Sequence, residues 1–209
     1  MKFLRSTLPV LLLSASILSF AGVQQPQDTL RPNVGNPTLR LELLSMKDRD
    51  QAIRNDFISK MSTHRTDSVL LAKMIAIDTA NTQRIKEIIH QFGWPGRTFV
   101  GQDGAQAVFL IVQHSPDTLF QRSCLPLLQN AFKAGEASGQ DLALLTDRVL
   151  VREGKPQLYG SQARFVNDKL ILDPIEDEAN VDKRRASLGL PPLSEYLEML
   201  KQVYRVKDK

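Results

Sequence analysis

The chain contains little cysteine, tryptophan or histidine. Its 209 residues include one cysteine, one tryptophan and three histidines. One cysteine cannot form a disulfide within the chain, so a packed core has to stabilise the fold. Cys124 stands in "SCLPLL", an apolar context typical of a buried small hydrophobic side chain. The histidines, His64, His90 and His114, are far apart and have no cysteine cluster beside them, so we predict no metal site and no cofactor.

Several functional motifs are also absent. The sequence has no Gly-x-x-x-x-Gly-Lys, no Gly-x-Gly-x-x-Gly, no Gly-x-Ser-x-Gly and no His-Glu-x-x-His. The formal net charge is only +4, and no basic stripe with interleaved aromatic residues is visible. Nucleic acid is therefore not a predicted partner.

The N-terminal residues have the pattern of a secretory signal peptide. Lys2 and Arg5 precede an apolar run from Leu8 to Phe20, and "SFAG" supplies a cleavage site after Ala21. The run is short for a membrane span. We therefore expect residues 1–21 to be removed and the protein to be exported, periplasmic or extracellular, with no stable membrane insertion after cleavage. An uncleaved anchor is the alternative. Without Lys2 and Arg5 the 27 basic residues fall to 25 against 23 acidic ones, a net charge of +2.

The rest of the chain has an ordinary globular composition, with 42% hydrophobic and 24% charged residues. Residues 22–38 are polar and rich in proline, which predicts a flexible leader. Residues 39–206 show no internal boundary, so a single mainly helical domain is expected. The predicted fold class is mostly α with a small antiparallel β-hairpin, and an α+β fold is the alternative.

Apolar periodicity and breaker residues place the elements within this domain. Asp50 and Arg54 lie one turn apart on the first predicted helix and are expected to pair on its surface. "GWPGRTFVGQDG" is expected to form an ordered loop, and "GAQAVFLIVQHS" a helix that is buried on all sides. The expected helices cover residues 39–61, 78 or 79 to 92, 104–114, 117–136 with an interruption near Pro126, 141–153, 174–188 and 194–204. Apolar residues dominate from Asp67 to Ile77. The expected hairpin covers residues 157–166 and 169–172 around an Asn167-Asp168 turn.

Charged and polar side chains follow one another closely between Leu144 and Gln162. Asp147 and Arg148 interrupt an apolar helical pattern, so each is expected to be buried and to need a partner. In an extended strand Gln157 and Tyr159 would share one face, and Gln162 would lie on the other. A polar pocket between the central helices and the hairpin is therefore expected.

Several sequence blocks, in order, resemble a bacterial family of unknown function, the domain of unknown function 6624. They include "DRDQAIR", "GWPGRTFVG", "GAQAVFLIVQHSPD", "FQRSCLPLL", "LALLTDRVLVREGKPQLYGSQ" and "PIEDEANVDKRRASLGLPPLSEY", and the resemblance covers about residues 45–197. It implies no activity. Ser161 stands where the family pattern would have threonine. The residues that the resemblance marks as characteristic are Gln51, Arg54, Trp94, Gln113, His114, Asp147, Arg148, Gln157, Tyr159, Gln162, Asp177, Arg184 and Arg185.

Three functional hypotheses remain open. In the first, the protein is an enzyme with His114 as general base and Asp147 orienting it. In the second, it is a non-catalytic module that binds a small polar or anionic ligand, and in the third the polar groups only hold the fold together. Whether the protein is an enzyme and what its oligomeric state is do not follow from the sequence. The predicted ligand-binding residues are Gln113, Arg148, Gln157, Tyr159, Gln162, Trp94, Arg184 and Arg185.

Overall fold

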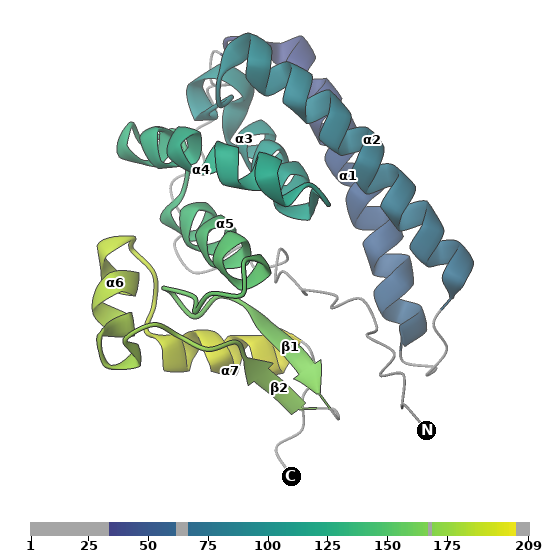
Figure 1. Ribbon diagram of the computed structural model, residues 1–209. Coiled ribbons are helices and arrows are strands. Elements are labelled where there is room, and N and C mark those ends of the chain that lie inside the picture. The colour runs from purple at the N-terminus through teal and green to yellow at the C-terminus, as the bar shows by residue number, and fades with distance from the viewer. Residues whose placement is uncertain (1–33, 62–66, 167–168, 204–209) are drawn as a thin grey trace. The chain divides into compact units, whose positions relative to one another are not determined.

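The computed structural model describes residues 34–61, 67–166 and 169–203. The helices are α1 (Pro37–Met61), α2 (Ser68–Phe92), α3 (Arg97–His114), α4 (Thr118–Lys133), α5 (Gly139–Arg152), the short 3-10 helix η1 (Glu178–Asn180), α6 (Val181–Ser187) and α7 (Leu193–Val203). The strands are β1 (Ala163–Val166) and β2 (Lys169–Leu172) (Figure 1). The predicted class, mostly α with a small antiparallel hairpin, is confirmed. None of the helices in these ranges is long and apolar enough to cross a membrane.

The chain divides into two compact units, one ending at Leu145 and the other beginning at Thr146. The prediction that residues 39–206 form one domain stays a prediction. The predicted signal peptide and the leader up to residue 33 lie outside the described residues. The last part of the predicted leader belongs to the first unit, because the N–H groups of Gly35 and Asn36 donate to the carbonyls of Thr98 and Phe99.

In the first unit, α1 and α2 run side by side and α3 packs against both (Figure 1). The core lies where the three helices meet, and burying its aliphatic side chains supplies the main stabilisation, at about 25 cal/mol per Å² of apolar surface. Its most enclosed members, none more than 1% exposed, include Leu43, Ile85, Ile88, Val108 and Ile111. From Gly104 to His114 nearly every residue of α3 is buried, as its apolar composition on all sides predicts.

Two helix boundaries of the first unit differ from the predictions. Helix α2 is continuous from Ser68, and its N-terminal cap is Asp67, whose carboxylate accepts from the N–H groups of Val69 and Leu70. Asp78 therefore lies inside the helix and does not begin one. Asp67 and Asp78 both have the local sequence of a helix cap. The helix continues through Asp78 because one face of α2 is buried along its whole length.

The predicted loop 93–104 is also partly helical. Arg97 to Val100 form a helical turn, and Gly101 then breaks the regular backbone with φ 76°. A Cβ on Gly101 would lie 3.2 Å from Nε of Arg40, so α1 approaches the backbone closely at this kink. Helix α4 runs through Pro126, where an interruption was predicted. A proline removes one backbone hydrogen bond, and the packed face carrying Cys124 and Leu128 keeps the helix in place.

The second unit contains the hairpin and the C-terminal helices. The β1–β2 pair is antiparallel, with Ala163 opposite Leu172. The predicted strand at residues 157–162 is wrong: these residues form bends and an isolated bridge between Gln157 and Ile175. Gly160, at φ 69°, cannot continue a strand. A small apolar core is formed by Ala163, Val181, Leu193, Tyr196 and Leu200.

Candidate functional site

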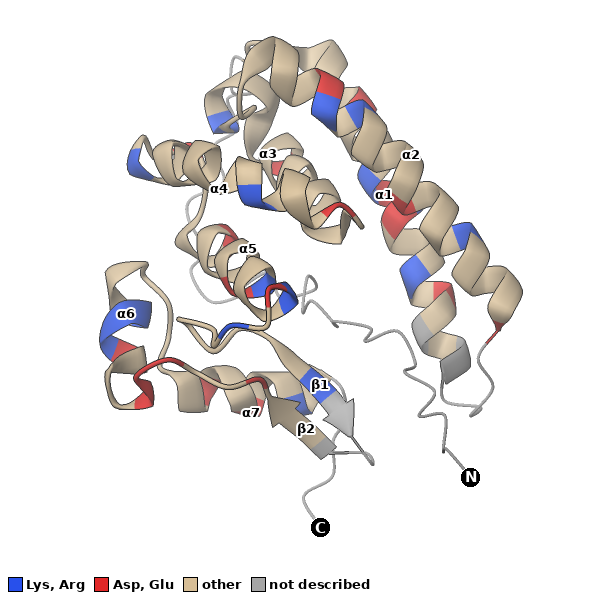
Figure 2. Ribbon diagram, in the orientation of Figure 1, with Lys and Arg blue, Asp and Glu red and all other residues tan. Residues whose placement is uncertain are grey.

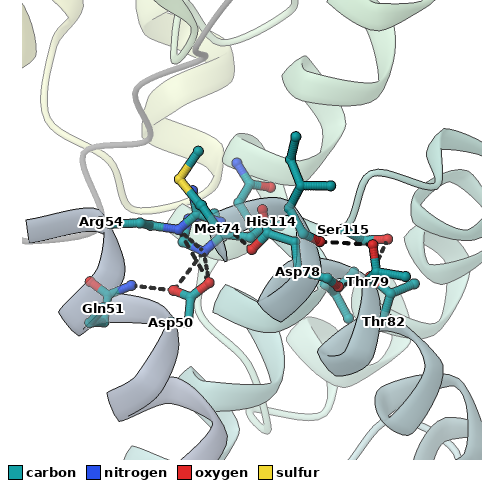
Figure 3. Close-up of polar contacts among 12 residues, drawn as sticks. Asp50, Gln51, Arg54, Met74, Asp78, Thr79, Thr82, His114 and Ser115 are labelled. Atoms are coloured by element: carbon teal, nitrogen blue, oxygen red, sulfur yellow. Dashed lines mark hydrogen bonds and ion pairs between the residues drawn. The ribbon is translucent and has the colours of Figure 1, made fainter. Parts of the chain in front are cut away.

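Four charged or titratable side chains meet inside the first unit. Asp50 and Arg54 come from successive turns of α1, Asp78 comes from the middle of α2, and His114 is the last residue of α3 (Figure 3). Asp50 is 1% exposed and His114 is 8% exposed. The prediction that Asp50 and Arg54 pair is confirmed at 3.2 Å, and the prediction that they do so on the surface is wrong. We call these four residues the dyad cluster, after the Asp50–His114 pair at its centre.

The imidazole of His114 faces the carboxylate of Asp50. Nδ1 of His114 lies 2.9 Å from both Oδ1 and Oδ2 of Asp50. The guanidinium Nε of Arg54 is 3.0 Å from the same Nδ1 and 3.2 Å from Oδ1 of Asp50. An Arg N–H can only donate, and it finds an acceptor in Asp50. The arrangement that satisfies all three groups therefore has a proton on Nδ1 donated to Asp50, which puts the lone pair of the neutral ring on Nε2.

Arg54 holds two carboxylates at once. Its Nη2 donates to Oδ1 of Asp78 at 2.6 Å, and its Nε donates to Asp50. Its Nη1 contacts the sulfur of Met74 at 3.4 Å, and a thioether is a weak acceptor. Because Nε and Nη2 already have carboxylate partners, this third donor position of the guanidinium is the one best suited to meet an additional acceptor.

The two carboxylates of the dyad cluster have opposite pKa shifts. Burial raises the pKa of Asp50, but the hydrogen bond and charge of His114, with the charge of Arg54, outweigh it and hold the pKa below its usual value. Burial dominates at Asp78 and raises its pKa to about 6, although Arg54 opposes the shift and the Asp50 charge adds to it. Two neighbouring carboxylates with pKa values pushed apart are a common arrangement in acid–base sites.

Neighbouring polar side chains fix the position of the dyad cluster. The Gln51 amide donates to Oδ2 of Asp50 at 2.7 Å. The Thr82 hydroxyl lies 2.7 Å from the Asp78 carbonyl and 2.9 Å from the Ser115 hydroxyl (Figure 3). The Gln121 amide of α4 donates to the carbonyls of Val112 and Gln113, both at 2.9 Å. The Val112 carbonyl also accepts from the Ser115 N–H at 3.2 Å, and Gln121 adds a side-chain donor to both carbonyls of the turn that carries His114.

The profile of the family of unknown function DUF6624 matches residues 37–209. The chain belongs to this family. No curated protein and no solved structure matches the chain. For this DUF6624 protein the geometry of the side chains is therefore the main guide to chemistry.

Gln113 and Trp94 are two further predicted ligand-binding residues of the same unit. Gln113 is fully buried, and its amide nitrogen is 3.5 Å from the Leu144 carbonyl. Trp94 is half-buried, and its enclosed indole N–H finds no acceptor in the described part of the chain. Their assignment to ligand binding stays a prediction.

Asp147, the predicted partner of His114, has another set of contacts in the DUF6624 chain. Its carboxylate accepts from the backbone N–H groups of Leu158, Tyr159 and Ser161 at 2.7 to 3.2 Å. Burial raises its pKa, and these hydrogen bonds oppose the rise. The carboxylate that lies against the His114 ring is Asp50, a residue that sequence reasoning placed on the surface. The catalytic roles assigned to His114 and Asp147 stay predictions.

The remaining predicted residues of the second unit hold the 157–162 loop. The Gln157 amide donates to the carbonyls of Gln162 and Asp173 and accepts from the N–H of Gln162. The Gln162 amide donates to the Ser161 hydroxyl at 3.1 Å. These bonds use every polar atom of the Gln157 side chain, which is the pattern of a structural amide.

Two arginines of α6 donate hydrogen bonds to backbone carbonyls of the same loop. Arg184 donates to the Leu158 carbonyl, and Arg185 donates to the Tyr159 carbonyl while its guanidinium lies 4.9 Å from the centre of the Tyr196 ring. Tyr159 is half-buried, and burial together with the Asp147 charge raises its pKa. Arg148 is 3% exposed, as the sequence predicts for an interrupted apolar face. These contacts support the structural hypothesis for this part of the molecule.

Proposed function

We propose that this DUF6624 protein is an exported enzyme in which His114 transfers a proton at Nε2 and Asp50 orients the ring. The observation that carries the proposal is the 2.9 Å separation between Nδ1 of His114 and both carboxylate oxygens of Asp50. A carboxylate on Nδ1 fixes the tautomer of a histidine and stabilises its protonated form, which is the requirement for a general base that later acts as an acid.

The substrate class that suits the dyad cluster is a small polar or anionic molecule. Arg54 carries the positive charge of the cluster, and its Nη1 has only the weak thioether acceptor in the described residues. An oxyanion is a stronger acceptor than a thioether, so it would compete for this donor. Asp78, with a pKa of about 6, supplies a second group that can change its protonation near neutral pH.

The tautomer of the His114 ring can be tested without a substrate. Nitrogen-15 NMR of the histidine-labelled protein is expected to show the neutral ring of His114 protonated at Nδ1, with the signal moving toward the other tautomer in Asp50→Asn. A ring protonated at Nε2 in the unchanged protein would contradict the proposal, because that nitrogen could not then accept a proton.

Activity is then measured on a panel of chromogenic carboxylic esters, phosphate esters and peptide anilides. General acid–base catalysis contributes about 10²- to 10⁴-fold, so His114→Ala should lose at least about a hundredfold in kcat. The matched control is His90→Ala, because His90 is exposed on α2 and should leave kcat unchanged. Melting curves of both variants establish that each one is folded at the assay temperature.

The near-complete enclosure of Asp50 and His114 favours one other reading, a polar network that only specifies the fold. Under that reading His114→Ala lowers the melting temperature and no substrate of the panel is turned over by any variant. Equal turnover by His114→Ala and the unchanged protein would likewise overturn the catalytic assignment.

Export is supported by the basic residues, apolar run and small-residue cleavage pattern of residues 1–21. N-terminal sequencing of the protein recovered from the periplasm or medium should begin at Gly22. Recovery of the intact N-terminus from a membrane fraction would favour an uncleaved anchor.

A further inference from the structure

A second polar site lies within the C-terminal unit, away from every residue of the dyad cluster in sequence. A pocket of about 470 Å³ is bordered by the end of α5, the following loop, β1 and the segment after β2. Pockets that hold small ligands commonly have volumes of about 300 to 1,000 Å³. The lining residues that matter for recognition are Arg152, Lys155, Arg164 and Asp173, with Val151 and Pro174 as apolar wall.

The pocket has three cationic side chains and one anionic side chain. Basic positions at the end of α5, in the loop after it and on β1 are visible in Figure 2. Lys155 is paired with Glu153 at 2.7 Å, while Arg164 is about half exposed. Nε of Arg164 lies 3.5 Å from Oδ1 of Asp173, which is close enough for attraction and too long for a strong hydrogen bond.

Asp173 is the unusual member of the lining. Its side chain is only 9% exposed, and its Oδ2 is enclosed with no hydrogen-bond partner in the described residues. A buried polar group without a hydrogen-bond partner destabilises the fold, and the cost is greater when the group is charged. Burial raises the pKa of this carboxyl, and the Arg164 charge opposes the rise. A carboxylate in this position therefore gains from a donor that the protein does not provide.

The backbone holds Asp173 in place. Its N–H donates to the Gln162 carbonyl at 3.2 Å, and its carbonyl accepts from the Gln157 amide at 2.7 Å. The buried Gln157, predicted from the sequence as a ligand-binding residue, thus positions the wall of the pocket. Relaxation of the backbone toward solvent would break both bonds, so the unmatched carboxylate is a fixed feature of this wall.

We propose that this pocket binds a small zwitterion, an amino acid or short peptide, with the ammonium group on Asp173 and the carboxylate on Arg164 and its cationic neighbours. A simple anion would satisfy the cations and leave Asp173 unmatched beside added negative charge. A simple cation would satisfy Asp173 and meet three positive side chains. Only a ligand with both charges matches the whole lining.

Calorimetric titration of the full chain with alanyl-alanine and two capped forms tests the proposal from the ligand side. The free dipeptide should bind, and N-acetyl-alanyl-alanine and alanyl-alanine amide should each bind at least about tenfold more weakly, because each lacks one charge. Absence of binding by the free dipeptide at roughly 10 mM, or equal binding of all three compounds, would overturn the proposal.

Two variants test it from the protein side. Asp173→Asn keeps the size of the side chain. It should bind alanyl-alanine and N-acetyl-alanyl-alanine about equally, and should still bind alanyl-alanine more tightly than its amide. Arg164→Gln should have the opposite effect. Lys133→Gln, at an exposed position of α4, is the charge-matched control and should bind like the unchanged protein.

The variant outcomes separate the proposal from its competitors. If Asp173→Asn retains the ammonium preference, Asp173 is not the anchor and the proposal is wrong. If capping the ammonium group changes the affinity of no protein, and capping the carboxylate weakens binding, the pocket binds anions and the zwitterion assignment is wrong. His114→Ala should bind the dipeptide normally, so failure of the proposed catalytic function leaves this test unaffected.

Discussion

Asp50 and His114 are 64 residues apart in the chain, yet the carboxylate of one touches the imidazole of the other at 2.9 Å. The contact exists because α1 and α3 pack along their apolar faces and leave one polar position on each helix opposite the other. Both groups are enclosed, so the pair is held by the fold and shielded from solvent.

Removing the Asp50 carboxylate should cost considerable stability. Asp50→Ala leaves the Arg54 charge without one of its two carboxylates, and breaking a buried ion pair from one side costs about 3 to 5 kcal/mol. Chemical denaturation should show this loss, whereas Asp48→Ala, at an exposed position of the same helix, should change the unfolding free energy by less than about 0.5 kcal/mol. Equal losses in the two variants would show that Asp50 is not engaged as described.

The pH dependence of stability should contain a contribution from Asp78. Its pKa is about 6 in the folded protein against 3.8 for the free side chain, so the folded state binds the proton more tightly. Its contribution is therefore fully present below pH 3.8 and is lost as the pH rises through about 6. The pKa difference corresponds to a contribution on the order of 2 to 3 kcal/mol.

Asp78→Asn isolates that contribution because asparagine cannot titrate and keeps an oxygen for Arg54. The unfolding free energy of the unchanged protein relative to Asp78→Asn should fall between pH 4 and pH 7. A constant difference between the two proteins over that range would show that Asp78 is ionised throughout.

The 157–162 loop should depend on the Asp147 carboxylate. Asp147→Ala leaves the N–H groups of Leu158, Tyr159 and Ser161 without their acceptor, a loss of about 3 to 5 kcal/mol. Hydrogen exchange at these three amides should accelerate in the variant. Glu176→Ala, an exposed acidic residue of the same unit, should leave their exchange unchanged. Unaltered protection in Asp147→Ala would contradict the assigned contacts.

Two glycines with the same backbone conformation should respond differently to alanine. Gly160 has φ 69° and Gly154 has φ 73°, so both substitutions carry the left-handed penalty of about 1 to 2 kcal/mol. At Gly160 the new Cβ would also lie 2.7 Å from Cδ1 of Leu193, whereas at Gly154 it meets nothing within 4 Å. Gly160→Ala should therefore be less stable than Gly154→Ala by about 1 to 3 kcal/mol in denaturant titrations. Equal losses would mean that the loop moves freely away from α7.

Cys124 should react only when the protein unfolds. The side chain is buried, and burial raises its pKa to about 12. At pH 8 about one thiol in ten thousand would be ionised, and the thiolate is the reactive form. A colorimetric disulfide reagent should find no free thiol in the native protein and one per chain in guanidinium, since the sequence has one cysteine. Rapid labelling of the native protein would contradict the assigned burial.

The sequence predicted the elements whose apolar period is regular, such as 39–61 and 104–114, because burial follows that period directly. Asp50 lies on the same buried period, although its spacing to Arg54 was interpreted as a surface ion pair. The buried positions of α1 recur at three- and four-residue steps and include the aspartate: Leu43, Met46, Asp50, Ile53 and Phe57. The same test places Asp78 one turn after the buried Met74 on α2, which identifies a second, half-buried acid.

Other features could not be predicted from local pattern. Residues 157–162 alternate as a strand would, but their backbone groups are taken by Asp147, Gln157, Arg184 and Arg185, three of them more than ten residues from the groups they bind. The partner of His114 also required tertiary information, because the order of Asp50, Asp78 and His114 along the chain does not show that α1, α2 and α3 converge. The burial of Asp147 and Arg148 was predicted correctly, and the three backbone N–H groups that Asp147 accepts from were not predicted.

The side chain of Gln121 has a consequence for dissecting this protein. Its amide donates hydrogen bonds to two carbonyls at the end of α3, so a side chain on the next helix supports the backbone that carries the imidazole. A shortened version that stops at the Ser115-Pro116 break would lose this support and let the histidine-bearing turn fray. A shortened version designed to keep the histidine-bearing turn intact should therefore extend beyond Gln121 into α4.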